Sequence, residues 1–319
     1  MAKILITGGA GFIGSHLCER LLHDKHEVIC VDNFLSGSRD NIAPFLSDSK
    51  FTFIEHDVCQ PLPSSVHLSS LDAIFHFACP ASPNPASPVS YMRFPVETMM
   101  VNTLGSQRML ELAHTNHCQI IFASTSEVYG DPAVHPQPET YWGNVSPNGP
   151  RSCYDEGKRA MEALAFAYHR HGATKIKVIR IFNTYGPHMR LDDGRFTINL
   201  IDAAVNNKPF KVHGDGSATR SFCYIDDMVE GIMRIFASDD AIGEVINLGN
   251  PGEYTLSEAI KIFEKIAGKT LIKQQSSTPP EDPQRRCPDI NKAKRILDWE
   301  PRIDFARGMQ KTLKYYANK

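Results

Sequence analysis

The sequence predicts an α/β protein with a doubly wound parallel sheet and a smaller mixed α/β lobe at the carboxyl edge of that sheet. Through residues 1–182, short apolar runs alternate with longer helical patterns, which is typical of a parallel sheet covered by helices on both faces. After residue 182 the elements shorten and polar loops separate them, which indicates the second lobe. The expected strands are residues 3–7, 27–31, 51–54, 73–77, 119–123 and 177–181, and the expected helices include residues 13–23, 96–114 and 153–171.

The boundary between the two lobes is not expected to be a single cut. The first lobe is expected to span residues 1–182 and the second residues 183–319. A helical pattern at 224–236 followed by a strand at 245–248 indicates that residues 224–250 return to the first lobe. Residues 80–95 are too rich in proline for a helix or a central strand, so we expect a loop at the carboxyl end of the fourth strand.

The first strand runs directly into a glycine turn and then into a helix. Gly8, Gly11 and Gly14 are spaced by threes, and Gly9, Gly11 and Gly14 also form G-x-G-x-x-G. Such a turn lets the backbone approach a pyrophosphate, and the helix start offers free N–H groups. A second apolar run ends in Asp32, whose carboxylate suits the ribose hydroxyls of NAD and would repel the 2′-phosphate of NADP. Glycines also serve ordinary tight turns, but the strand, helix and acid around these favour a Rossmann-type NAD site. The expected cofactor contacts are Gly8, Gly11, Phe12, Ile13, Gly14, Asp32, Asn33, Asp57 and Val58, together with Tyr154 and Lys158.

The composition argues against several other classes of function. A net charge of −2 does not point to nucleic acid or to an anionic membrane, and no apolar run approaches the roughly 20 residues of a membrane-spanning helix. The thirteen histidines show no metal-ligand spacing, and the eight cysteines include no C-x-x-C pair. The apolar start is too short for a signal peptide. We therefore expect a cytoplasmic protein with reduced thiols, no metal, no nucleic-acid partner and no membrane segment.

Tyr154 and Lys158 are four residues apart in the third expected helix, so their side chains share one face. Lowering the pKa of a tyrosine from about 10 to near 7 takes about 4 kcal/mol of preferential stabilisation of the phenolate. One cation about 4 Å away supplies an energy of this order at an effective dielectric constant near 20. Lys158 is one such cation, and an oxidised nicotinamide would be a second. An amphipathic helix can also carry this spacing by chance, but the glycine turn in the same chain favours a catalytic pair.

Residues 124–127, Ser-Thr-Ser-Glu, directly follow the expected strand at 119–123. Their side chains are therefore expected at the carboxyl edge of the sheet, where substrates bind in this architecture. A hydroxyl of Thr125 or Ser126 could bind a sugar oxygen, and Glu127 could act on a neighbouring carbon. Alternatively, these residues only end the strand and cap the next turn.

Four features together resemble the extended short-chain dehydrogenases/reductases that modify nucleotide sugars, and the resemblance runs nearly end to end. They are the glycine turn, Thr125, the pair of Tyr154 and Lys158, and the stretch Arg-Ile-Phe-Asn-Thr-Tyr-Gly-Pro at 180–187. More narrowly, residues 125–131, 141–143, 154–158, 193–195 and 282–289 are similar to the UDP-glucuronate decarboxylases, also called UDP-xylose synthases. The resemblance implies that the tyrosine and the lysine serve oxidation at sugar C4 by bound NAD.

The three residues at 125–127 distinguish among the related enzymes. Sugar-nucleotide 4,6-dehydratases carry an Asp and a Glu after the Thr, whereas this chain has Ser126 in place of the Asp. A serine hydroxyl cannot replace a carboxylic acid in proton transfer, so dehydration is disfavoured. Epimerases of the superfamily typically lack an acid at the position of Glu127, so simple epimerisation is disfavoured too.

The resemblance also implies several substrate contacts. Arg286 aligns with an arginine placed near the sugar carboxylate, a task that suits the two parallel N–H donors of a guanidinium. Arg220 is expected at the UDP pyrophosphate, Arg195 at the substrate loop, and Asn183 at the diphosphate or the sugar. His213 replaces a tyrosine of the family in the uridine segment, and Cys287 replaces a basic or polar residue. Without the family pattern, these arginines would be read as solvated loop residues.

Together these points imply NAD-dependent decarboxylation of UDP-glucuronate to UDP-xylose and CO₂ through a 4-keto intermediate, with the cofactor regenerated in each turnover. Tyr154 would be the base, Thr125 and Tyr154 would stabilise an enolate, and Glu127 and Arg286 would position the carboxylate and help manage protonation at C5. The resemblance also implies a homodimer. The alternatives are a 4,6-dehydratase or 4-epimerase of another nucleotide sugar, and a regulator that senses NAD without turnover.

Overall fold

The central sheet contains seven parallel strands in the order β11-β6-β5-β4-β1-β2-β3. The computed structural model describes residues 1–62, 68–172, 174–277 and 283–318. The predicted parallel α/β sheet is confirmed, and its last strand comes from far along the chain, since β11 pairs with β6. The strands are β1 (Lys3–Thr7), β2 (Glu27–Asp32), β3 (Phe51–Glu55), β4 (Ala73–His76), β5 (Gln119–Thr125), β6 (Lys175–Ile181) and β11 (Val245–Leu248).

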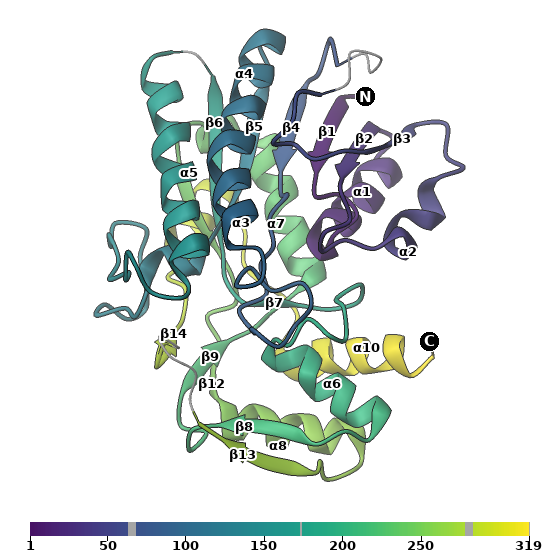
Figure 1. Ribbon diagram of the computed structural model, residues 1–319, viewed down its shortest axis with the longest axis vertical. Coiled ribbons are helices and arrows are strands. Elements are labelled where there is room, and N and C mark those ends of the chain that lie inside the picture. The colour runs from purple at the N-terminus through teal and green to yellow at the C-terminus, as the bar shows by residue number, and fades with distance from the viewer. Residues whose placement is uncertain (63–67, 173, 278–282, 319) are drawn as a thin grey trace.

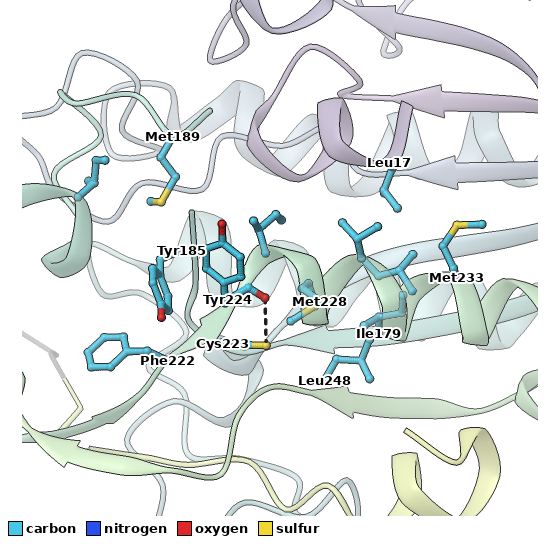
Figure 2. Close-up of a cluster of buried hydrophobic side chains, with 14 of the residues drawn as sticks. Leu17, Ile179, Tyr185, Met189, Phe222, Cys223, Tyr224, Met228, Met233 and Leu248 are labelled. Atoms are coloured by element: carbon cyan, nitrogen blue, oxygen red, sulfur yellow. Dashed lines mark hydrogen bonds between the residues drawn. The ribbon is translucent and has the colours of Figure 1, made fainter. Parts of the chain in front are cut away.

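Helices cover both faces of this sheet, as Figure 1 shows. One face packs against α1 (Phe12–His23) and α7 (Ile225–Ala237), and the other against α4 (Ser106–Asn116) and α5 (Ser152–Arg170). In β1, Ile4 and Ile6 face the first layer, whereas Leu5 faces the second. Strands buried on both faces read as continuous apolar runs, which explains why they were visible in the sequence. Part of the core on the α1 and α7 side appears in Figure 2.

The expected helix at 96–114 is interrupted by a π-helical turn. The segment forms α3 (Pro95–Met100), the turn η2 (Val101–Gly105) and α4. Within the turn, the Asn102 side chain donates to the Thr98 carbonyl at 2.8 Å and to the Cys79 thiol at 3.2 Å. A side chain that engages the helix carbonyls in this way accounts for the local widening, which helical periodicity alone does not reveal.

The second group of elements lies beyond the carboxyl ends of the sheet strands, in the lower part of Figure 1. Three small sheets form there, with the orders β12-β9-β14, β13-β8 and β10-β7. The strands are β7 (Thr184–Tyr185), β8 (Phe210–His213), β9 (Thr219–Ser221), β10 (Cys223–Tyr224), β12 (Glu253–Thr255), β13 (Lys273–Ser276) and β14 (Arg285–Arg286). The helices are α6 (Phe196–Asn206), α8 (Leu256–Ala267) and α10 (Phe305–Ala317). In contrast, α9 (Asn291–Leu297) packs against β11 and α7 of the first lobe, and the short helix α2 (Arg39–Ile42) lies beneath α1 in Figure 1. Within the described ranges, no helix has the length and apolar character needed to cross a membrane.

Candidate active site

A cavity of about 1010 Å³ lies between the carboxyl ends of the sheet strands and the second group of elements. Its walls contain all the site residues predicted from the sequence, although these come from segments spread along the whole chain. They are Gly8, Gly11, Phe12, Ile13, Gly14, Asp32, Asn33, Asp57, Val58, Thr125, Ser126, Glu127, Tyr154, Lys158, Asn183, Arg195, His213, Arg220 and Arg286. The structure therefore brings together the expected cofactor, catalytic and substrate residues.

The glycine turn fits a pyrophosphate. Gly8 has a φ of +72°, and a Cβ on Gly14 would lie 2.1 Å from the Gly8 carbonyl oxygen, so neither position accepts a side chain without rearrangement. Helix α1 starts at Phe12 with no side-chain cap and no acidic residue in its first turn. Its first N–H groups and the positive end of its dipole are thus left for an anion in the cavity.

Asp32 is the last residue of β2, and its side chain contacts the glycine turn. Its carboxylate accepts N–H bonds from Ala10 at 3.0 Å and from Phe34 at 2.8 Å. Burial raises its pKa, although these two hydrogen bonds oppose the shift. Asn33 and Asp57 likewise accept backbone N–H bonds, from Leu35 and from Cys59. A carboxylate oxygen has lone pairs beyond those used here, so Asp32 can also accept bonds from ribose hydroxyls.

Strand β5 extends two residues further than expected, because it pairs with β6 over seven positions up to Thr125 and Ile181. Thr125 is therefore the last strand residue, and Ser126 begins the short turn η3 (Ser126–Tyr129). The Thr125 hydroxyl accepts the Glu127 N–H at 3.2 Å, and the alternative of a capping role is thus observed. The same hydroxyl also shares a hydrogen bond with Tyr154. Capping and a place at the reacting centre are compatible.

The environment of Tyr154 differs from the expectation in one respect. Burial raises the pKa of its phenol, and the hydrogen bond with Thr125 and the charge of Arg195 only partly oppose this. The Lys158 ammonium donates a hydrogen bond to the Ala123 carbonyl at 2.7 Å, and it lies over the Tyr154 ring, 5.9 Å from the ring centre. Burial lowers the pKa of Lys158 itself. Burial thus works against ionisation of Tyr154, and the surrounding side chains offset this only in part.

Tyr91 is a site residue that the sequence did not reveal. Its ring stacks on Tyr154 with centroids 4.8 Å apart and 8° between the planes. Tyr91 is 1% exposed and lines the cavity, and its hydroxyl has no hydrogen-bond partner among the described residues. It lies in the proline-rich loop after β4. The only signal was that such a loop faces the cofactor side of the sheet.

Glu127 is held between two arginines. The Arg286 guanidinium contacts its Oε1 and the Arg151 guanidinium contacts its Oε2. Burial alone would raise the pKa of Glu127, but Arg151, Arg286 and, more weakly, Arg220 outweigh it and lower the pKa to about 2. Glu127 is therefore ionised at neutral pH. A low pKa favours a positioning role for Glu127 over donation of a proton to C5.

Arg286 and Arg220 lie side by side on neighbouring strands. Strands β14 and β9 are parallel, and the two arginines are register partners. Arg286 is 3% exposed and Arg220 is 9% exposed, so neither is the solvated loop residue that the sequence alone would suggest. Besides Glu127, Arg286 donates to the Gly130 carbonyl at 3.1 Å. The result is a buried, cationic wall at the substrate side of the cavity.

The other predicted substrate residues lie around this wall. Arg195 pairs with Asp193 at 3.0 Å, His213 Nδ1 contacts the Ser277 carbonyl at 3.0 Å, and the Asn183 carbonyl accepts the Cys223 N–H. Cys287 is buried, and its backbone N–H donates to the Gln137 side-chain oxygen. Its side chain is not part of the cavity wall. Asp282, the first residue of the motif at 282–289, lies outside the described residues. Within the described ranges, no group of three His, Cys, Asp or Glu side chains could hold a metal ion.

The glycine turn and the strand-end residues share one cavity with Tyr154 and Lys158, and this combination defines a dinucleotide-binding α/β protein of the Rossmann type. Residues 4–249 match the profile of the NAD dependent epimerase/dehydratase family. The chain belongs to this family, and NAD is its cofactor.

Two relatives illustrate the similarity in sequence. UDP-glucuronic acid decarboxylase 5 of Arabidopsis thaliana is 47% identical over 308 residues, which cover 96% of this chain and 87% of the relative. UDP-glucuronic acid decarboxylase 1 of Danio rerio is 44% identical over 317 residues, or 99% of this chain and 73% of the relative.

Two solved structures illustrate the similarity in fold. A UDP-glucuronic acid 4-epimerase from Bacillus cereus, in complex with UDP-glucuronic acid and NAD, has a TM-score of 0.84 and 30% identity, with 98% of each chain covered. A dTDP-glucose 4,6-dehydratase from Streptomyces venezuelae with NAD bound has a TM-score of 0.88 and 27% identity, covering 99% of this chain and 97% of the other.

Proposed function

We propose that this protein decarboxylates UDP-glucuronate to UDP-xylose and CO₂ and regenerates NAD in each turnover. The observation that carries the proposal is the buried wall of Arg286 and Arg220 beside Glu127, in the cavity that also contains Tyr154. A sugar carboxylate fits such a wall, since guanidinium groups bind carboxylates through two parallel N–H bonds. The identity of 44–47% with UDP-glucuronic acid decarboxylases over nearly the whole chain supports the same substrate.

The chain's own residues would act on the sugar as follows. NAD, when bound, supplies a hydride acceptor for C4 and returns the hydride at the end of the cycle. Tyr154 takes the proton of the C4 hydroxyl, and the resulting C4 ketone lies β to the carboxylate. The carboxylate can then leave as CO₂ because its bonding electrons pass into an enolate. Hydrogen bonds from Thr125 and Tyr154 stabilise the enolate oxygen. C5 then takes a proton from water, and Tyr154 gives its proton back to the C4 oxygen in the last step.

The polar residues have separate tasks in this proposal. Arg286 binds the carboxylate, and Glu127 holds Arg286 in place rather than delivering a proton. Lys158, anchored on the Ala123 carbonyl, places a buried cation over the ring of Tyr154 and would help hold the NAD. Arg220 meets the UDP diphosphate, with Asn183, Arg195 and His213 as further contacts along the nucleotide.

Dehydration and epimerisation are disfavoured by the same residues. Ser126 is buried and occupies the position where a 4,6-dehydratase needs an acidic side chain. A serine hydroxyl does not replace that acid. A regulator that only senses NAD would have no need for the buried pair of Tyr154 and Lys158.

The decisive experiment is incubation of the purified protein with UDP-glucuronate, followed by mass spectrometry and NMR of the product. We expect a UDP-pentose lighter than the substrate by CO₂, and no requirement for added NAD if the cofactor copurifies. A UDP-hexuronate epimer would sink the proposal, as would a stable 4-keto-6-deoxy product from a nucleotide hexose.

We also propose the two lobes expected from the sequence, with residues 1–182 and 224–250 forming the NAD lobe and the rest of 183–319 mainly binding the nucleotide sugar. The pairing of β11 with β6 supports the return of the chain. A homodimer is proposed from the resemblance, and light scattering after size-exclusion chromatography tests it. The eight free cysteines are compatible with a cytoplasmic location.

A further inference from the structure

Arg151 is a buried arginine that has no task in the proposed chemistry. It immediately precedes α5 and is 6% exposed. Its guanidinium contacts Glu127, and its Nε lies 3.9 Å from Asp155 Oδ2. A buried guanidinium keeps its charge at any pH a protein experiences, so it must be paired where it lies.

The contacts of Glu127 are divided between its two oxygens. Arg151 occupies Oε2, from the side of α5, and Arg286 occupies Oε1, from the side of β14. Because both oxygens are engaged, the carboxylate cannot rotate without losing one of the two arginines. The direction of the Arg286 guanidinium therefore depends on Glu127, and the position of Glu127 depends on Arg151.

Arg151 is also tied to the first turn of the helix that carries Tyr154. Its carbonyl accepts the Tyr154 N–H at 3.0 Å and the Asp155 N–H at 3.1 Å. One residue thus contacts the helix of the expected base through its backbone and the arginine wall through its side chain. Removal of its charge would leave Glu127 with a direct contact to Arg286 and only the weaker effect of Arg220, in a site where burial raises the carboxyl pKa.

We propose that Arg151 is a positioning residue that holds the Glu127 carboxylate against Arg286, and so sets the direction in which Arg286 meets the carboxylate of the substrate. The identity of that substrate rests on the proposed function. The linkage from Arg151 through Glu127 to Arg286 rests on the contacts alone.

A double-mutant cycle tests this linkage. The variants are Arg151→Gln, Glu127→Gln, the double variant and Arg151→Lys, with Arg170→Gln as a control that removes the same charge from an exposed position at the end of α5. If Arg151 acts through Glu127, Arg151→Gln lowers kcat/KM for UDP-glucuronate by about tenfold or more, and the double variant is no worse than Glu127→Gln. Arg151→Lys restores part of the activity, and Arg170→Gln matches the wild type.

The pH dependence gives a second readout that a merely structural role would not change. On acidification, Arg151→Gln loses activity at a higher pH than the wild type, because Glu127 then binds a proton more readily. Glu127→Gln cannot show this loss. Wild-type activity in Arg151→Gln would overturn the proposal. So would a double variant whose loss is the product of the two single losses, since Arg151 would then act independently of Glu127.

A measurement without turnover separates this proposal from the proposed function. The protein is labelled with ¹³C at the glutamate side-chain carboxyls, and the Glu127 signal is assigned by its absence in Glu127→Gln. We expect this signal to titrate at clearly higher pH in Arg151→Gln than in the wild type. An unchanged titration overturns the linkage. If no variant, the wild type included, releases CO₂ from UDP-glucuronate, the proposed function fails and the titration still decides the linkage.

Discussion

The rings of Tyr91 and Tyr154 lie parallel in the wall of the cavity, with 4.8 Å between their centroids. Tyr154 belongs to α5, whereas Tyr91 belongs to the loop that follows β4. This stack fixes the plane of the expected base through a residue with no role in the sequence motifs. The loop is thereby part of the active site and not only its cover.

The stack predicts different effects for two substitutions of Tyr91. Tyr91→Ala should lower the free energy of unfolding by about 3–5 kcal/mol, because a fully buried ring leaves a cavity. Tyr91→Phe should stay within about 1 kcal/mol of the wild type, since the hydroxyl has no partner among the described residues. Urea denaturation measures both. Equal losses of unfolding free energy in the two variants would show that the Tyr91 hydroxyl, and not the ring, provides the stabilisation.

Tyr154→Phe should abolish turnover while the fold and NAD binding persist. Loss of a general base lowers kcat by about 10²- to 10⁴-fold. The matched control is Tyr168→Phe on the same helix, which lies outside the cavity and should retain full activity. CO₂ release and calorimetric titration with NAD are the measurements. Unchanged turnover in Tyr154→Phe would reject the proposed base.

The low pKa of Glu127 predicts a specific dependence of the protein's stability on pH. Its pKa in the folded protein, about 2, lies below its ordinary value of 4.5. Its contribution to stability is therefore fully present above about pH 4.5 and is lost as the pH falls toward about 2. The difference in unfolding free energy between the wild type and Glu127→Gln should be constant above about pH 5 and shrink below it.

The control for this pH series is Glu111→Gln, which removes an exposed carboxylate of α4. Its difference from the wild type should stay small throughout. A wild-type advantage over Glu127→Gln that grows on acidification would contradict the assignment of Glu127 as an ionised partner of the two arginines.

Gly14→Ala should remove NAD binding. The added Cβ would lie 2.1 Å from the Gly8 carbonyl oxygen and 2.8 Å from the Gly9 Cα, so the turn must open. Gly172→Ala is the control, because its Cβ meets nothing within 4 Å although its φ is also positive. The control should lose about 1–2 kcal/mol of stability and keep its NAD affinity. Calorimetry with NAD would contradict the prediction if Gly14→Ala bound as tightly as the wild type.

Most of the sheet was predictable because its signals are local. A strand buried on both faces must be apolar along its length, and the run at 3–7 could not be polar and remain at 0% exposure, as Ile4, Leu5 and Ile6 are. The glycine turn was visible for the same reason, since the close approach of Gly14 to Gly8 permits no side chain. The end of β5 was misplaced by two residues because the pairing with β6, which extends it to Thr125, is not local.

The site was only partly predictable. The family resemblance identified Glu127 and Arg286 but not that they touch, since they are far apart in the sequence and meet only when β14 docks beside β9. Arg151 lies three residues before Tyr154 in the same helical turn, a spacing that could have indicated it. No pattern indicated Tyr91, because loop residues follow no periodicity.

The sequence by itself determined the class of fold, the glycine turn and the residues available for chemistry. Burial on both faces requires apolar residues along a strand, and exclusion of a Cβ requires glycine, so both constraints are visible in the residue types. Only the tertiary structure decided how those residues are used. It placed Lys158 on the Ala123 carbonyl and over the Tyr154 ring, and it kept Glu127 ionised between two arginines. These outcomes depend on charges and burial contributed by distant segments, so they arise only after the chain has folded.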